Sequence, residues 1–165
     1  MASSSIPVSV FREAIIEQMT ETFHHGNIHY LDPGSSLFET LANVSSATAS
    51  QSASNRVGTL AAQIDHIAYY IEVLLVHAAA GGDDPTYEAD WSLAWQRTSV
   101  TDAEWAELIE NLGQKWREFR QFVETTEDWN ADLVAGAMAV VSHSAYHLGE
   151  VRQALGVIPE SSPGE

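Results

Sequence analysis

Residues 101–156 read TDAEWAELIENLGQKWREFRQFVETTEDWNADLVAGAMAVVSHSAYHLGEVRQALG, and the helical pattern of this stretch decides the fold. Thr101 is followed three residues later by Glu104, which is the spacing of a capping box at a helix N-terminus. Apolar residues then recur every three or four positions, as on the buried face of an amphipathic helix. We therefore expect one helix to run from Thr101 to about Thr126.

A second helical pattern follows almost at once. It runs from about Asn130 to Leu155, and Gly156 closes it. Residues 127–129 are all that separate the two patterns, and short connections usually join antiparallel helices that pack together. We therefore expect these two helices to be antiparallel neighbours.

Two further long helices precede this pair, one from about Val8 to His25 and one from about Val57 to Ala80. No strand pattern appears in the sequence, which predicts an all-α protein built as a four-helix bundle. The connection 81–100 is long enough to cross the bundle from end to end. The residues alone therefore leave open whether the second and third long helices run parallel.

The 165 residues fit a single domain, 1–165, and a chain of this length can bury a core without disulfides. We expect the core to span about residues 8–156 and the acidic tail, 157–165, to be disordered. Between the first two long helices, Ser36 to about Val44 predicts a short helix. The small polar residues at 45–55 predict a loop or a frayed turn.

The composition narrows the classes of function. The chain has no cysteine, which excludes disulfides, thiolate zinc sites and a cysteine nucleophile. Seven Lys and Arg stand against 23 Asp and Glu, and a net charge of −16 repels phosphate backbones, so we expect no nucleic-acid partner. No apolar run reaches the length of a membrane span and no signal-peptide pattern opens the chain, so we expect a cytoplasmic protein with no membrane partner.

The candidate site lies in HSAYHLGE, residues 143–150. His143, His147 and Glu150 project from one face, because a helix turns by about 100° per residue. Two imidazoles four residues apart can share one metal ion, and catalytic zinc sites commonly take three protein ligands. His66, in the middle of the second long helix, is the best third ligand. The spacing alone leaves two interpretations open, a metal site or histidines that line a helix without a metal.

Other catalytic patterns do not fit the sequence. Ser144 stands where a zincin needs a glutamate after its first histidine, and there is no G-x-S-x-G or Walker loop. A di-iron bundle needs two Glu-x-x-His units and two further carboxylates, whereas the chain has one such unit, Glu21 to His24.

The order of these features resembles the DinB/YfiT-like family of metalloenzymes. That family has a histidine in the middle of the second long helix and an H-x-x-x-H pair in the fourth, continued roughly as H-x-G-[QE]-[IV]-R. Residues 147–152, HLGEVR, match this continuation closely. SLFETLANVSSATAS at 36–50, the tryptophan-bearing connection and TDAEW at 101–105 are also similar to the family, so the resemblance covers about residues 8–156.

The resemblance implies an up-down-down-up bundle, commonly a homodimer, in which His66, His143 and His147 hold one divalent zinc, nickel, iron or manganese ion. It also implies an enzyme that acts on a small-molecule substrate, as a hydrolase or as a transferase using a low-molecular-weight thiol. Two alternatives stay open: a non-catalytic metal-binding sensor or dimeric helical scaffold, and an interaction bundle without a metal.

Glu150 is the candidate catalytic residue beyond the three ligands, because it can orient His147 or accept a proton. A solvated glutamate near a helix end is the alternative interpretation. Trp91 and Trp95 are expected to pack the connection 81–100 onto the bundle, or to wall the pocket. Asp65 is next to His66 in the chain but points about 100° away from it, so we assign it no role.

Overall fold

The protein is described by a computed structural model that covers residues 5–26, 28–54, 58–81 and 87–158. Over these residues it has six α-helices, one 3-10 turn and no strand, which confirms the all-α prediction. The long helices are α1 (Val8–Phe23), α4 (Leu60–Ala79), α5 (Asp102–Thr125) and α6 (Ala131–Leu155), and the short elements are α2 (Leu37–Leu41), α3 (Ser46–Ala49) and η1 (Leu93–Trp95). The described helices are each too short or too polar to form a transmembrane segment.

The predicted helix starts are made by side-chain caps. The Thr101 hydroxyl accepts from the backbone N–H of Glu104, and the Glu104 carboxylate accepts from the backbone N–H of Thr101, so the expected capping box of α5 is confirmed. Asn130 caps α6 in a similar way, through the backbone N–H of Leu133. The predicted start of the second long helix at Val57 lies outside the described residues.

The stretch predicted as a loop or frayed turn contains one turn of helix, α3. The Ser45 hydroxyl accepts a hydrogen bond from the backbone N–H of Thr48, and this local cap is enough to close the turn. The structure describes the first two residues of the predicted tail 157–165, and Ile158 packs into the core with 8% of its surface exposed. Residues 159–165 lie outside the described part.

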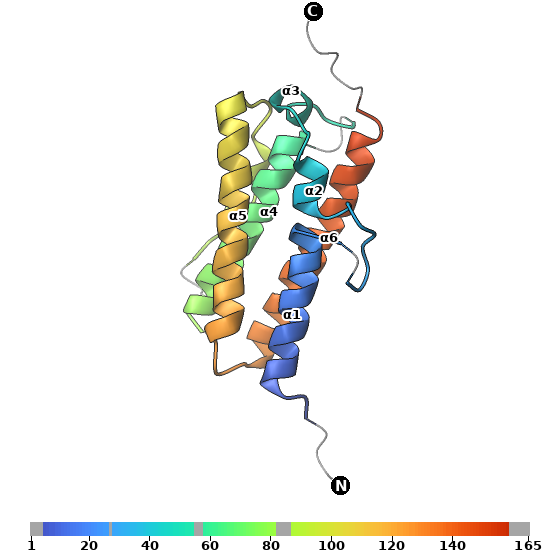
Figure 1. Cartoon of the computed structure of the whole chain (residues 1–165). Coiled ribbons are helices and arrows are strands. Elements are labelled where there is room, and N and C mark those ends of the chain that lie inside the picture. The colour runs from blue at the N-terminus through green and yellow to red at the C-terminus, as the bar shows by residue number, and fades with distance from the viewer. Residues whose placement is uncertain (1–4, 27, 55–57, 82–86, 159–165) are drawn as a thin grey trace, which may run out of the picture.

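The four long helices pack in a ring. The helix α4 contacts α5 and α6, and α1 contacts the same two helices, so α5 and α6 lie at opposite corners (Figure 1). The two helices run antiparallel, as expected, but they are not the closely packed neighbours that their short connection predicts (Figure 1). Trp129, in the connection between them, explains the difference, because its ring packs on Phe11 of α1 at 4.8 Å and on Phe122 of α5 at 5.6 Å. The connection thus crosses the end of α1 before α6 begins.

The starts of α4 and α5 lie close together, because both helices contact α3 near one end of the molecule (Figure 1). The chain travels between them through residues 80–101. The full up-down-down-up order stays a prediction. The core between the helices is apolar and is built from all four of them. Leu74 and Leu75 of α4 are half-buried.

A buried carboxylate organises the segment between α1 and α2. Glu21 of α1 is fully buried, and its two oxygens accept four backbone N–H bonds of 2.8–3.0 Å, which come from Ile28, His29, Tyr30 and Leu31. The chain folds back so tightly that a Cβ on Gly26 would lie 2.3 Å from the carbonyl oxygen of Asp32. Glycine is therefore required at position 26.

Candidate metal centre

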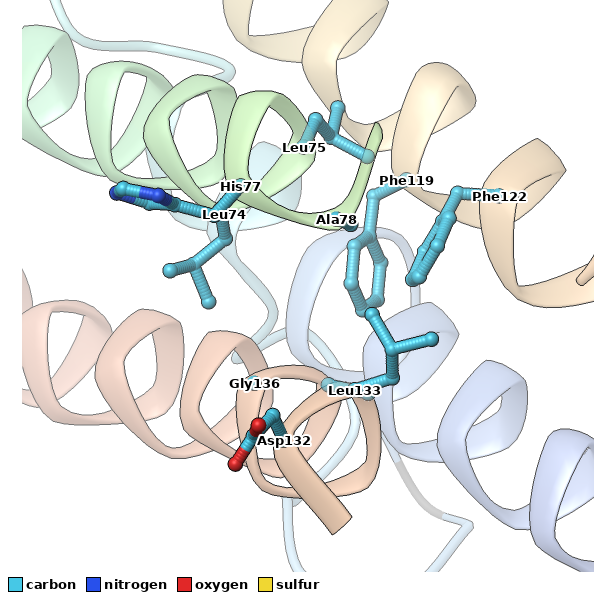
Figure 2. A pocket seen from close by; sticks show the side chains of 10 residues that line it. Leu74, Leu75, His77, Ala78, Phe119, Phe122, Asp132, Leu133 and Gly136 are labelled. Atoms are coloured by element: carbon cyan, nitrogen blue, oxygen red, sulfur yellow. The ribbon is translucent and has the colours of Figure 1, made fainter. Parts of the chain in front are cut away.

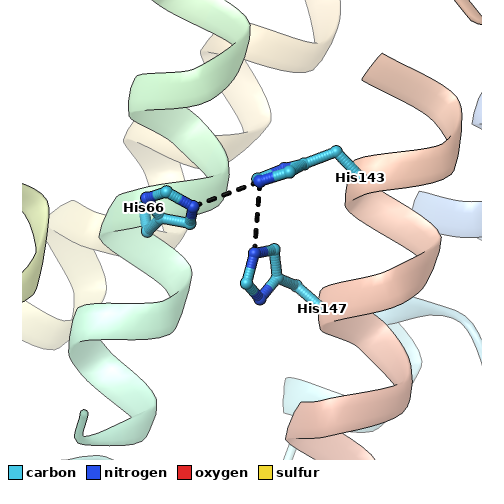
Figure 3. A group of neighbouring side chains, drawn as sticks. All are labelled: His66, His143 and His147. Carbon is cyan, nitrogen blue, oxygen red and sulfur yellow. Dashed lines mark hydrogen bonds between the residues drawn. The ribbon is translucent and has the colours of Figure 1, made fainter. Parts of the chain in front are cut away.

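Three imidazoles from two helices meet in the interior between α4 and α6 (Figure 3). The Nε2 atom of His143 lies 3.1 Å from Nε2 of His66 and 3.2 Å from Nε2 of His147. His66 and His147 are 8% and 5% exposed, and His143 is half-buried. The structure thus brings together the three histidines predicted as ligands. Among the described residues, they form the group of histidine or acidic side chains whose ligand atoms lie close enough to hold one ion.

The three imidazoles are neutral at pH 7. Burial lowers the pKa of His66 to about 4, with a further contribution from His147. Burial likewise lowers the pKa of His143 to about 3, and the other two histidines add to the effect. Burial also lowers the pKa of His147, although Glu150 opposes the change. Neutral imidazole is the form that offers a lone pair to a metal ion.

Proton counting shows how well this donor set fits a cation. Each neutral ring carries one N–H and one lone pair. If His147 places its proton on Nδ1, facing Glu150, its Nε2 offers a lone pair to the cluster. His143 has one Nε2 and therefore cannot both accept from His66 and donate to His147 through it. One of the two short Nε2–Nε2 contacts therefore has no proton between its nitrogens. A cation placed among the three Nε2 atoms would accept a lone pair from each of them.

Glu150 contacts His147 through Nδ1, the ring nitrogen that does not face the other two histidines. One of its carboxylate oxygens lies 2.7 Å from Nδ1 of His147, on the side of the ring opposite Nε2. The two atoms are close enough for an ion pair, but the oxygen does not lie along the direction of the Nδ1–H bond. The contact therefore lacks the alignment of a good hydrogen bond. The hydroxyl of Tyr146 donates to the other carboxylate oxygen at 2.6 Å. Glu150 is therefore in contact with both His147 and Tyr146.

Aromatic rings hold the other two histidines. Tyr70 stacks flat on His143, with ring centres 3.7 Å apart and planes 9° apart. Trp95 lies 4.5 Å from the ring of His66, and Trp91 lies 6.3 Å from it. Trp91 and Trp95 are 42% and 37% exposed, so they contact the histidines on one side and solvent on the other. Both rings therefore pack their part of the connection against His66.

The connection that carries these tryptophans is fastened to α4. Arg97 pairs with Asp65 at 2.9 Å, and its carbonyl oxygen accepts from the Thr59 hydroxyl at 2.6 Å. Asp65 thus serves the connection and not the metal site, as its position on the helix predicted. A Cβ on Gly58 would lie 3.0 Å from the Trp95 ring, so the absence of a side chain at 58 lets this ring approach α4.

The remaining histidines lie elsewhere. His24 packs on Trp116, His29 lies 3.1 Å from the carboxylate of Glu17, and His77 packs on Tyr87. Glu21, from the single Glu-x-x-His unit, is occupied by backbone N–H groups, as described above.

Comparison with known families agrees with this geometry. The model of the DinB superfamily matches residues 34–151, which is more than two thirds of the chain. The chain belongs to the DinB superfamily. Searches of curated proteins and of solved structures gave no match. The matched range contains all three histidines and Glu150, so the family match and the metal-compatible cluster involve the same part of this DinB superfamily member.

Tyr70 and Tyr146 are the residues of the site that the sequence did not single out. Tyr70 follows His66 by four residues, and Tyr146 precedes Glu150 by four, so both lie on the same helix faces as their partners. This spacing was an available signal, but aromatic residues on a half-buried helix are usually core residues.

Proposed function

We propose that this DinB superfamily member is a metal-dependent enzyme in which His66, His143 and His147 hold one divalent ion. The observation that carries the proposal is the convergence of three neutral imidazole nitrogens from α4 and α6 on one point. Zinc, nickel, iron and manganese are all candidates, because imidazole ligands suit several of these metals and affinity order alone does not decide occupancy.

When bound, such an ion supplies Lewis acidity that lowers the pKa of a bound water or thiol and so generates a nucleophile at neutral pH. Activation of water makes the protein a hydrolase, and activation of a thiol makes it an S-transferase. The chain has no cysteine, so in the transferase the sulfur comes from a low-molecular-weight thiol cosubstrate.

We assign Glu150 a positioning role in this reaction. Its carboxylate lies 2.7 Å from Nδ1 of His147, and the negative charge at that distance favours a proton on Nδ1 and a lone pair on Nε2, which faces the cluster. Tyr146 holds the carboxylate in turn by its hydrogen bond. This geometry supports orientation of His147 over the alternative that Glu150 accepts a proton directly.

Trp91 and Trp95 form the proposed wall of the substrate site, because each ring contacts His66 and is more than one third exposed. A small molecule that reaches the histidines from this side packs against indole rings. The proposal also includes the up-down-down-up order, the homodimer and the cytoplasmic location expected above. Light scattering on the purified protein tests the dimer.

The central test is elemental analysis of the protein as isolated and after titration with each candidate metal. We expect about one ion per chain in the native protein and almost none in His66→Ala, with the same helical circular dichroism in both. His25→Ala is the matched control, because His25 is an exposed histidine whose backbone N–H donates to Thr20 of α1, a helix that carries none of the three clustered histidines. A native protein that binds none of these metals would refute the proposal.

A second test separates an enzyme from a metal-binding sensor. The metal-loaded protein is screened with several cellular thiols and electrophilic acceptors, and with a panel of ester and amide substrates. We expect turnover that is lost in His66→Ala. Tight metal binding without turnover on either panel would favour the sensor.

A further inference from the structure

A cavity of about 190 Å³, open to solvent on one side, lies between α4, α5 and α6, where α4 and α5 end and α6 begins (Figure 2). Its walls are apolar and are formed by Leu74 and Leu75 of α4, Phe119 and Phe122 of α5, and Leu133 of α6. These side chains face a common space in Figure 2. Leu74 and Leu75 line this space, which explains why they are only half-buried.

The cavity is separate from the metal centre. Leu74 follows His66 by eight residues on α4, and Gly136 precedes His143 by seven on α6. With a rise of about 1.5 Å per residue, these separations are about 12 Å and about 10 Å along the two helices. None of the three histidines lines the cavity. Occupation of this space and binding of a metal are therefore distinct events.

The size and lining of the cavity select a class of ligand. Protein interiors are close-packed and contain few voids larger than a water molecule. An apolar cavity of about 150 Å³ lined by Leu, Ile and Phe in another protein stays free of water and binds benzene. The present cavity has a similar size and a similar lining, and it is open to solvent on one side, so a molecule with a single aromatic ring can enter it and displace water from the apolar walls.

Gly136 keeps this space open. It lies in the interior of α6, where glycine is a poor helix former compared with alanine. A Cβ on Gly136 would lie 3.7 Å from Cδ1 of Leu74, which is an ordinary contact. Packing therefore does not require glycine here, and a larger side chain at 136 would project toward the cavity.

Charge excludes anionic ligands. Among the described residues that line the cavity, His77 and Asp132 are the polar ones, and Asp132 is exposed. The net charge of the chain is −16. The Asp132 carboxylate at the rim of the cavity repels an anion. A neutral molecule can enter, and if it carries a hydroxyl group, that group stays at the rim in contact with water.

We propose that this cavity binds a small neutral aromatic molecule of one ring, at a site separate from the metal centre. The probes are benzene and phenol. We expect each to raise the melting temperature of the native protein saturably, and to shift the NMR methyl signals of Leu74 and Leu133 more than those of leucines near the histidines.

Gly136→Leu fills the cavity and should weaken binding of both probes at least tenfold. Gly149→Leu is the matched control, because Gly149 is also in α6 but has open space around its Cβ position, so binding should be unchanged. Ala78→Leu fills the same space from α4 and serves if Gly136→Leu does not fold. His66→Ala should retain both probes.

The proposal is overturned if the native protein shows no saturable binding, or if the folded filling variants bind as tightly as the native protein. Loss of binding in His66→Ala would place the probes at the metal centre and would also overturn it. A protein without a metal that still binds benzene in this cavity would refute the proposed enzyme and support the present inference.

Discussion

Replacing the buried carboxylate of Glu21 with an amide is expected to destabilise the protein in a manner that depends on pH. In Glu21→Gln one carboxylate oxygen is replaced by an NH2 group. The backbone N–H of His29, which donates to Oε2 of Glu21 at 2.8 Å, would then face another donor. The three N–H groups that share Oε1 would also lose the negative charge of their acceptor.

The size of the expected loss in stability follows from the pKa of the Glu21 carboxyl. Burial raises the pKa of the Glu21 carboxyl, but the four backbone hydrogen bonds outweigh it and lower the pKa from 4.5 to about 2. A lowered folded-state pKa contributes stability above the unfolded-state value, and the stability is lost as pH falls toward the folded-state value. At about 1.4 kcal/mol per unit, the contribution is about 3 kcal/mol at pH 7 and about 1 kcal/mol at pH 3.

The assay is urea unfolding of native protein and Glu21→Gln, followed by circular dichroism at several pH values between 7 and 3. The difference in the free energy of unfolding should be about 3 kcal/mol at pH 7 and should shrink as the pH falls below 4.5. Glu17→Gln, one helical turn earlier and exposed, is the control and should have little effect. A difference below about 1 kcal/mol at pH 7, or one that does not change with pH, would refute the reasoning.

Four further outcomes are expected. Glu150→Gln should weaken metal binding by about 10- to 100-fold in a chelator competition, with the fold unchanged. Tyr70→Ala should weaken it by about tenfold, and Tyr70→Phe, which keeps the stacked ring, should not; equal effects would contradict the stacking role. Gly58→Ala should displace Trp95, shift the tryptophan emission to longer wavelength and cost about 1 kcal/mol of stability. Because burial lowers the pKa values of the ligand histidines, the metal affinity of the folded protein should fall less than about tenfold from pH 7 to pH 5, and a thousandfold loss would contradict their neutral state.

The helices were predictable wherever a local signal marks their ends. The capping box of Thr101 and Glu104 lies where the sequence predicts it, and Asn130 caps the helix that was predicted to begin there, because these hydrogen bonds join residues only three positions apart. The neighbour relation of α5 and α6 was not predictable in this way. It depends on Trp129, whose packing partner Phe11 is more than 100 residues away in the chain.

The site shows the same division. Periodicity placed His143, His147 and Glu150 on one face, and the three histidines do lie together. The rings around them come from a connection without periodicity, and the position of Trp95 depends on the small residue at 58. The cavity beside Gly136 could not be predicted from sequence patterns, because its lining residues come from three helices that are far apart in the sequence.

The arrangement of buried groups also indicates how metal binding and folding are related. In small zinc domains the metal supplies the free energy of folding, because there is little else to bury. Here the apolar core draws on α1, α4, α5 and α6, and the three histidine rings are held by Tyr70, Trp95 and Glu150 through contacts that need no ion. The protein without metal should therefore stay folded, with its three Nε2 atoms already close together. A bound metal then adds stability only through mass action, as RT ln(1 + [M]/Kd), so the melting temperature should rise with metal concentration from an already cooperative baseline.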